Sequence, residues 1–462
     1  MKKIAMFALF LIAVVTLSFA QQQVPVQQQM PPGYNFVPYI PPEAIDIAGA
    51  TTRTPMAEDH AWALFVALNW PAPQNGKYNG VPDRNNVIGG RTAGGEDVPA
   101  APAGPTVWQT YMDTNDLFLP GAAKPASFDA KQSIPAPCKS VARDGHRVLR
   151  MTEKVSDVLQ SIHEANPNVR LIAQNGKEVW YEVRVNRAYY DYVVNNGLYN
   201  SNNRKGKKIS FPAGSSTGRG EGAIRVKAAW MEITDRAQAR YLYTSEALLY
   251  SPKTSRCRAA TMGLVGLHIV HKTETFPSWV WATFEHVYNA PDVADVQSGQ
   301  VTVPPPGFWF YDPKCKDCLW NQPPLNNDPH PRPTQVVRYP PVVSSGSTNR
   351  EALNTSFSAA LRQLGSANVW QYYGLVDAQW GLASGTPEDV LCLTNATMET
   401  YIQCGSSPIE RPGQQATNVQ GCMACHSQAK KTDFDFQLLK ASPAMTLGDV
   451  RRAIDALDGQ PQ

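Results

Sequence analysis

The segment MGLVGLHIVHKTETFPSWVWATFEHVY, residues 262–288, contains the clearest strand pattern of this chain. Two runs rich in β-branched and aromatic residues, 262–271 and 278–288, favour strands. The connection between them, residues 272–277, is short and polar and ends in a proline. We therefore predict that the two runs pair as an antiparallel hairpin.

Alternation assigns the side chains of these strands to the two faces of a sheet, because successive side chains of a strand point in opposite directions. Residues 222–233 alternate in the same way and form a third predicted strand, with apolar side chains on one face and Arg225 and Lys227 on the other. In the run 278–288 the two faces are expected to hold Trp279, Trp281, Thr283 and Glu285 on one side and Val280, Phe284 and His286 on the other.

Helices are predicted on both sides of this strand region. Residues 59–70 are apolar nearly all round and stop at Pro71, which indicates a buried helix. Apolar residues recur every three or four positions over 349–365 and again over 446–459, as they do in amphipathic helices. We expect an α+β protein, with an N-terminal mixed region that contains an antiparallel sheet and a mostly helical C-terminal segment.

Composition divides the chain into five predicted parts. They are a signal peptide at 1–20, a Pro- and Gln-rich extended arm at 21–45, an α+β domain at 46–302, a Pro-rich linker at 303–347 and a helical segment at 348–462. Residues 1–20 begin with Lys2 and Lys3, continue with an apolar run and end in small residues, which is the layout of a secretory signal. The apolar run is short for a membrane span, although a retained anchor is the alternative. The mature chain is expected to be periplasmic or secreted, without stable membrane insertion.

Overall charge gives no support for nucleic-acid binding. The 42 Lys and Arg residues nearly balance the 39 Asp and Glu residues, for a formal net charge of +3. Nucleic-acid-binding domains usually carry a clear basic excess. A hydrophobic fraction of 43% with 11 tryptophans is enough for a substantial core.

The motif with the clearest chemistry is Cys422-Met-Ala-Cys425-His426. A Cys-x-x-Cys-His run is typical of c-type haem attachment. On a helix, residues three and four apart share a face, so Cys422, Cys425 and His426 present themselves to one object. The two thiols would form thioethers with the porphyrin, and His426 would be the proximal iron ligand. We expect one covalent haem c, held by the helical segment 348–462.

Two other interpretations of this motif remain. The cysteines could form a structural disulfide, or they could be a thioredoxin-like dithiol that happens to precede a histidine. The βαβ pattern that accompanies a thioredoxin-like motif is missing from the preceding sequence. The six further cysteines are expected to form disulfide bonds in an exported chain.

A second axial ligand is not determined by the sequence. The candidates are Met445, which follows the motif, and His271 and His286 on the predicted hairpin. His268 lies on the same hairpin, but its side chain and that of His271 point to opposite faces. Methionines and histidines are more often core or surface residues than iron ligands, so the distal ligand stays unassigned.

The chain resembles a group of exported bacterial cytochrome c family proteins of similar length. The resemblance rests on residues 65–71 (FVALNWP), 266–269 (GLHI), 281–286 (WATFEH), 395–401 (NATMETY) and 422–426 (CMACH). It implies a single covalent haem on Cys422, Cys425 and His426, and it implies no substrate.

These features predict an exported monohaem c-type cytochrome that acts in electron transfer. The alternative is a haem-dependent oxidoreductase of the peroxidase or oxidase type, with an open distal iron site. The size of the chain supports this alternative, because an electron carrier needs far fewer residues. The expected partner is a redox protein or a small-molecule electron donor or acceptor.

Overall fold

The computed structural model describes residues 36–44, 53–73, 79–89, 104–150, 170–218, 220–252, 254–315, 317–324, 332–339, 349–380, 393–403 and 422–441. Its main feature is one eight-stranded sheet. The strands are β1 (Met112–Asp113), β2 (Arg147–Leu149), β3 (Trp180–Val185), β4 (Ile224–Glu232), β5 (Thr244–Ser251), β6 (Arg256–His271), β7 (Val280–His286) and β8 (Tyr373–Trp380).

Helices are fewer and mostly short. The α-helices are α1 (Arg53–Leu68), α2 (Thr114–Leu117), α3 (Arg187–Asn195), α4 (Val293–Ser298), α5 (Asn349–Leu364) and α6 (Cys422–His426). Short 3-10 segments are η1 (Trp108–Thr110), η2 (Pro120–Ala122), η3 (Ala136–Cys138), η5 (Ser201–Arg204), η6 (Arg236–Arg240), η7 (Val369–Tyr372), η8 (Ser427–Thr432) and η9 (Gln437–Lys440). Among the described residues, no helix has the length and apolarity to cross a membrane.

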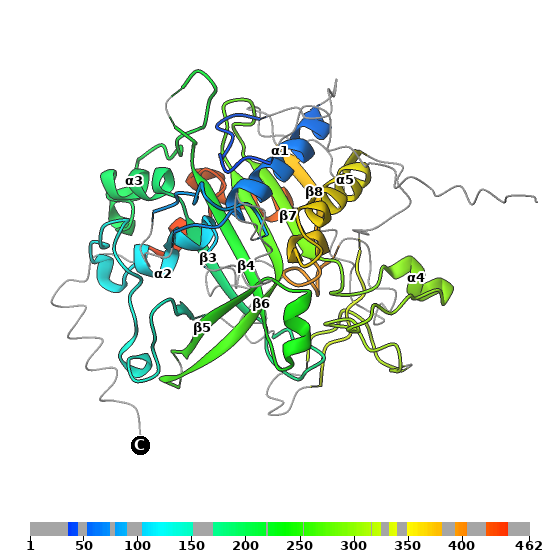
Figure 1. Ribbon diagram of the computed structural model, residues 1–462. Helices are drawn as coiled ribbons and strands as arrows, with labels where there is room; N and C mark the ends of the chain where they lie inside the picture. Colours follow the sequence, from blue (N-terminus) through cyan, green and yellow to red (C-terminus); the bar gives the residue numbers. More distant parts are fainter. Residues whose placement is uncertain are drawn as a thin grey trace, which may run out of the picture.

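Strand β6 organises the sheet (Figure 1). The order is β1-β3-β4-β6-β5-β2, and β7 adds to β6 and then pairs with β8. The first half of β6 pairs with β5 and its second half with β7, so the sheet divides on that side of β6. Every pair is antiparallel except β2 with β5.

The predicted hairpin is confirmed. His271 of β6 lies opposite Val280 of β7, and the register continues to Gly266 opposite Glu285. The predicted strand at 222–233 is confirmed as β4, which pairs with the other edge of β6. The predicted faces follow from these registers, because directly paired residues share a face.

One face, which we call the helix face, is covered by α1 and α5 (Figure 1). Trp62 of α1 stacks on Phe357 of α5 with ring centroids 4.4 Å apart, and Phe65 packs on Phe284 of β7 at 4.4 Å. All four rings are fully buried. The predicted buried helix before Pro71 is therefore confirmed as α1, and its all-round apolarity follows from burial.

The opposite face, which we call the motif face, carries polar side chains. It includes Arg225 and Lys227 of β4, His268 of β6, and Trp281, Thr283 and Glu285 of β7. Two segments from the end of the chain cover it, residues 393–403 and 422–441, shown in orange to red in Figure 1. This arrangement places the cysteine motif on the sheet.

The predicted fold class is wrong, because the described structure is mostly one eight-stranded sheet with few helices and has no helical C-terminal haem segment. Residues after 348 supply α5, then strand β8 in the main sheet, and then irregular segments with the five-residue helix α6, rather than a mostly helical haem-binding segment. A bulge shifts the register of β8 opposite Thr283 and Phe284, so the alternation of Tyr373–Trp380 is broken. The predicted helix at 446–459 lies outside the described residues.

Burial of Glu58 makes the contact between α1 and α5 sensitive to pH. Its carboxylate accepts a hydrogen bond of 2.6 Å from Asn349, the first residue of α5. Burial, assisted by nearby Asp377, raises the pKa of Glu58 to about 7, although the Asn349 hydrogen bond opposes the change. The ionised native state is therefore penalised, and stability should fall as the pH rises from the unfolded pKa to the folded one.

Glu58→Gln is expected to leave stability unchanged near pH 4, because both side chains are then neutral. Above pH 7 the variant should be more stable than the wild type, by about 3 kcal/mol at most. Glutamine still accepts the Asn349 hydrogen bond, so only the charge changes. Urea unfolding at both pH values checks this, and an equal difference at the two would contradict it.

Candidate functional site

Helix α6 is a single turn that carries the cysteine motif onto the edge of the sheet. The backbone N–H of Met423 donates a 3.0 Å hydrogen bond to Oε1 of Gln379 in β8. Met423 is buried, while Cys422 and His426 are partly buried. The backbone of all five motif residues is helical, as predicted for this stretch.

The His426 ring is held by one hydrogen bond and two aromatic contacts. Nδ1 lies 2.8 Å from the carbonyl oxygen of Phe434. Trp281 of β7 and Phe436 contact the ring, with centroids 4.3 and 4.7 Å away. Because a carbonyl only accepts, the proton is on Nδ1, and the Nε2 lone pair is left available. Nε2 has no hydrogen-bond partner among the residues that the structure describes.

Electrostatic surroundings keep this histidine neutral. Burial lowers the pKa of His426 well below its ordinary value, and the nearby cations Arg225 and Lys227 add to the effect, as does His268. The hydrogen bond to the Phe434 carbonyl raises the pKa of His426, but by less than burial and the cations lower it. Neutral imidazole is the form that binds metals. A metal-binding histidine usually donates its other N–H to a carbonyl or carboxylate, as His426 does. The donor set therefore fits a haem whose iron is bound by Nε2.

Two aspartates fix the turn that carries the Phe434 carbonyl. Asp433 forms a buried ion pair with Lys272, the residue after β6. Asp435 forms another with Arg225 of β4, at 2.7 Å. These pairs attach the turn to the sheet on two neighbouring strands, so the hydrogen-bond partner of His426 has a defined position.

Asp433 also has a left-handed backbone, with φ of 57°. Asp433→Asn and Asp433→Ala both remove the charge, but asparagine tolerates this conformation better than alanine. We expect Asp433→Ala to lose about 1 kcal/mol more stability than Asp433→Asn, since left-handed backbone costs other residues roughly that much. Urea unfolding of the two variants measures the difference, and equal losses would show that the backbone conformation is unimportant.

The structure does not bring the predicted distal histidines to this site. His271 lies on the helix face, where Nδ1 is 3.0 Å from Nε2 of His60 and Nε2 contacts the Glu221 carbonyl. His286 also faces away, with Nε2 2.9 Å from the carbonyl of Tyr241. Burial lowers the pKa of His271 to about 4 and that of His286 to about 3.

Both ring nitrogens of each of these two histidines are engaged, since Nδ1 of His286 accepts a 3.1 Å hydrogen bond from the indole of Trp309. Alternation correctly separated the two faces, but it carried no information about which face receives the cysteine motif. Met445 lies outside the described residues.

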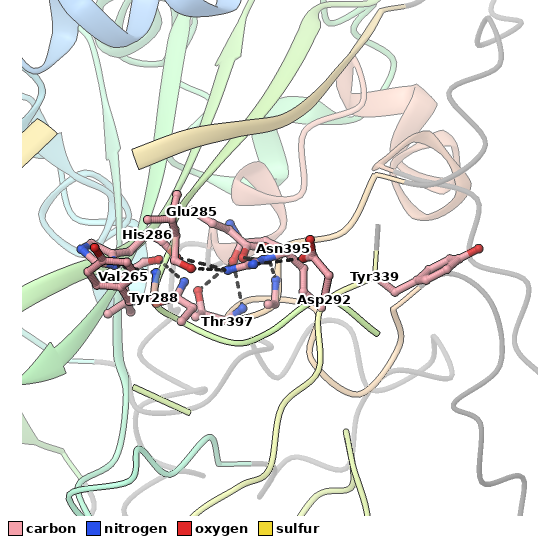
Figure 2. Close-up of polar contacts among 12 residues, drawn as sticks. Val265, Glu285, His286, Tyr288, Asp292, Tyr339, Asn395 and Thr397 are labelled. Carbon is pink, nitrogen blue, oxygen red and sulfur yellow. Dashed lines mark hydrogen bonds and ion pairs between the residues drawn. The ribbon is translucent and has the colours of Figure 1, made fainter. Parts of the chain in front are cut away.

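Glu285, next to His286, anchors residues 393–403, one of the two segments that cover the motif face (Figure 2). Its carboxylate pairs with Arg338 at 3.0 Å and accepts the backbone N–H of Ala396. Nearby, Asn395 donates to Thr283 of β7 at 2.9 Å. Figure 2 shows Glu285, Asp292 and Asn395 gathered beneath the sheet. The polar residues of the WATFEH segment are thus explained by packing.

No family model, curated protein or solved structure matches this chain. The resemblance to exported cytochrome c family proteins therefore stays a prediction.

Proposed function

We propose that the protein is a monohaem c-type cytochrome that transfers electrons outside the cytoplasm. Cys422 and Cys425 would attach the haem covalently, and His426 would bind its iron. The observation that carries the proposal is the hydrogen bond from His426 Nδ1 to the Phe434 carbonyl, within a Cys-x-x-Cys-His motif. A disulfide or a dithiol gives no reason to orient the following histidine in this way.

When bound, the haem supplies one-electron exchange between ferric and ferrous iron. The chain supplies an oriented, neutral imidazole. Trp281 and Phe436 contact the ring of His426, which is partly buried. Burial and hydrogen bonding to the axial histidine are among the features by which proteins set a haem potential. These residues are therefore expected to set the potential.

An exported location is part of this proposal. A disulfide joins Cys138 in η3 to Cys257 in β6, across 119 residues, and a second joins Cys315 to Cys318. Disulfides form and persist in oxidising compartments such as the bacterial periplasm. The signal-like residues 1–20 support the same location. The partner would be a redox protein or a small-molecule electron donor or acceptor.

Haem retention after denaturation tests the proposal. The full chain, with its N-terminal signal, is expressed with a c-type maturation system and purified. We expect coloured protein that keeps its pigment in acid–acetone and on a denaturing gel. Colourless protein, or pigment that passes into the organic solvent, would refute covalent attachment and the proposed function with it.

A further inference from the structure

The disulfide between Cys315 and Cys318 closes a very short loop on the surface. The two cysteines have a sequence separation of 3, and both are partly exposed. The stabilisation that a disulfide gives to a fold increases with the length of the loop that it closes, so a loop this short gains little. We therefore expect the folded chain to tolerate reduction of this bond.

Hydrogen bonds hold both ends of this loop without help from the disulfide. The side-chain oxygen of Gln335 accepts the N–H of Asp312 at 2.8 Å, and its backbone carbonyl accepts the N–H of Asn321 at 2.8 Å. Asn321 also exchanges two hydrogen bonds with the backbone of Val337, at 3.0 and 3.1 Å. Cys315 itself donates its N–H to the Asp312 carbonyl at 3.1 Å. These contacts should keep the two sulfurs close to each other after reduction, as reoxidation requires.

Cys138 and Cys257 form a disulfide of a different kind. It joins η3 to β6 across a sequence separation of 119. Cys138 is fully buried with Val148 and Leu248, and Cys257 packs against this group. An external thiol can reach Cys138 only when this packing opens, and reduction would release a long loop. The chain thus contains one disulfide that is suited to stability and one that is suited to exchange.

A cation lies next to the exposed disulfide. Lys314 is exposed and directly precedes Cys315. Thiol–disulfide exchange proceeds through thiolates, because a donor thiolate attacks and a cysteine thiolate leaves. A neighbouring ammonium group stabilises such anions. Lys314 is therefore expected to favour both the approach of a donor thiolate and the thiolate form of Cys315.

We propose that the Cys315–Cys318 disulfide is a redox site that accepts electrons from a dithiol of another protein. A donor thiolate attacks one sulfur, the S–S bond breaks, and the other cysteine leaves as a thiolate. The second donor thiolate then attacks the mixed disulfide and releases the remaining cysteine. Two electrons and, after protonation, two protons pass to the chain, and the donor becomes a disulfide. The site does not involve the haem, so this inference goes beyond the proposed function.

Dithiothreitol, a small dithiol, is the probe that tests this site. The oxidised full chain is treated with it in the absence of denaturant, quenched with N-ethylmaleimide and mapped by mass spectrometry. Cys315 and Cys318 should be labelled at a rate proportional to the dithiothreitol concentration, while Cys138 and Cys257 stay unlabelled. Oxidised glutathione should then restore the disulfide. The urea midpoint of the chain should be the same before and after reduction of this loop.

Lys314→Glu should slow the reduction, because it replaces the cation with an anion. Lys139→Glu is the matched control, since Lys139 is exposed and follows Cys138 of the buried disulfide, and it should leave the rate unchanged. Labelling of Cys315 and Cys318 only after urea has unfolded the chain would overturn the inference, as would a reduced loop that does not reoxidise. Colourless protein that passes these tests would refute the proposed cytochrome and support this site.

Discussion

Replacing both Cys422 and Cys425 with alanine is expected to abolish covalent haem attachment. Each thiol would contribute one thioether, so the double variant retains only His426 as a link to the porphyrin. A single axial imidazole does not survive acid or detergent. The haem stain of the denatured polypeptide should fall to background, and acid–acetone should extract any remaining pigment. Each single variant keeps one thioether and should show a weakened signal.

The chain contains its own control for this experiment. Cys315 and Cys318 have the same spacing but are followed by Leu319 rather than histidine, and they form a disulfide. Replacing this pair should leave the haem stain unchanged. Retention of stain in the Cys422 and Cys425 double variant, or its loss in the Cys315 and Cys318 variant, would show that the haem-bearing motif has been misassigned.

Local patterns predicted the centre of the fold well. The alternation of 262–271 and 278–288 gave the β6–β7 hairpin, and it separated the side chains of the two faces as the register does. The all-round apolarity before Pro71 gave α1. These elements are set by neighbours a few residues apart and by burial of one face or of all faces, and both leave a periodic trace in the sequence.

Strands β3 and β8 left no such trace. Strand β3 buries Glu182 and Arg184, which are 1% exposed and pair with each other at 2.6 Å. Charged residues that are buried and paired only through tertiary contacts cannot be told from surface residues in a sequence. Strand β8 is interrupted by a bulge and places Asp377 and Gln379 on the motif face. The bulge and the polar residues of β8 therefore conceal the strand that the C-terminal part adds to the sheet.

The candidate site was predictable only in part. The spacing of Cys422, Cys425 and His426 marks it in the sequence. The partners of His426 do not follow from that spacing, because Trp281 is 145 residues earlier and the Phe434 carbonyl belongs to a turn without a pattern. Alternation separates His268 from His271, but it does not indicate which of the two faces the cysteine motif covers.

Loss of Arg338 is expected to destabilise the protein strongly. Its guanidinium lies 3.0 Å from Glu285 and 3.2 Å from Asp292, and it also donates to the carbonyls of His286 and Val287. Arg338 is 2% exposed and Glu285 is fully buried. Arg338→Met would leave the Glu285 charge buried without its cation, which typically costs about 3–5 kcal/mol.

A second substitution should recover much of this loss. Glu285→Gln removes the buried charge and keeps an oxygen that can accept the Ala396 N–H. The double variant Arg338→Met, Glu285→Gln is therefore expected to be more stable than Arg338→Met alone. Urea unfolding of the four proteins gives the coupling between the two sites. Additive losses would mean that Arg338 acts through Asp292 and the carbonyls rather than through Glu285.

Burial, rather than the presence of an ion pair, is the reason for this large effect. Arg187 and Asp129 form a pair with a shorter distance of 2.6 Å, but their side chains are 49% and 50% exposed. Water solvates either partner when the other is removed, so Arg187→Met should cost less than about 1 kcal/mol. Since Arg338 pairs with Glu285, and Glu285 accepts the Ala396 N–H, Arg338→Met should also loosen residues 393–403. Faster hydrogen exchange of the Ala396 N–H, which is bonded to Glu285, would show this loosening. Unchanged exchange at Ala396 would mean that the substitution lowers only the global stability.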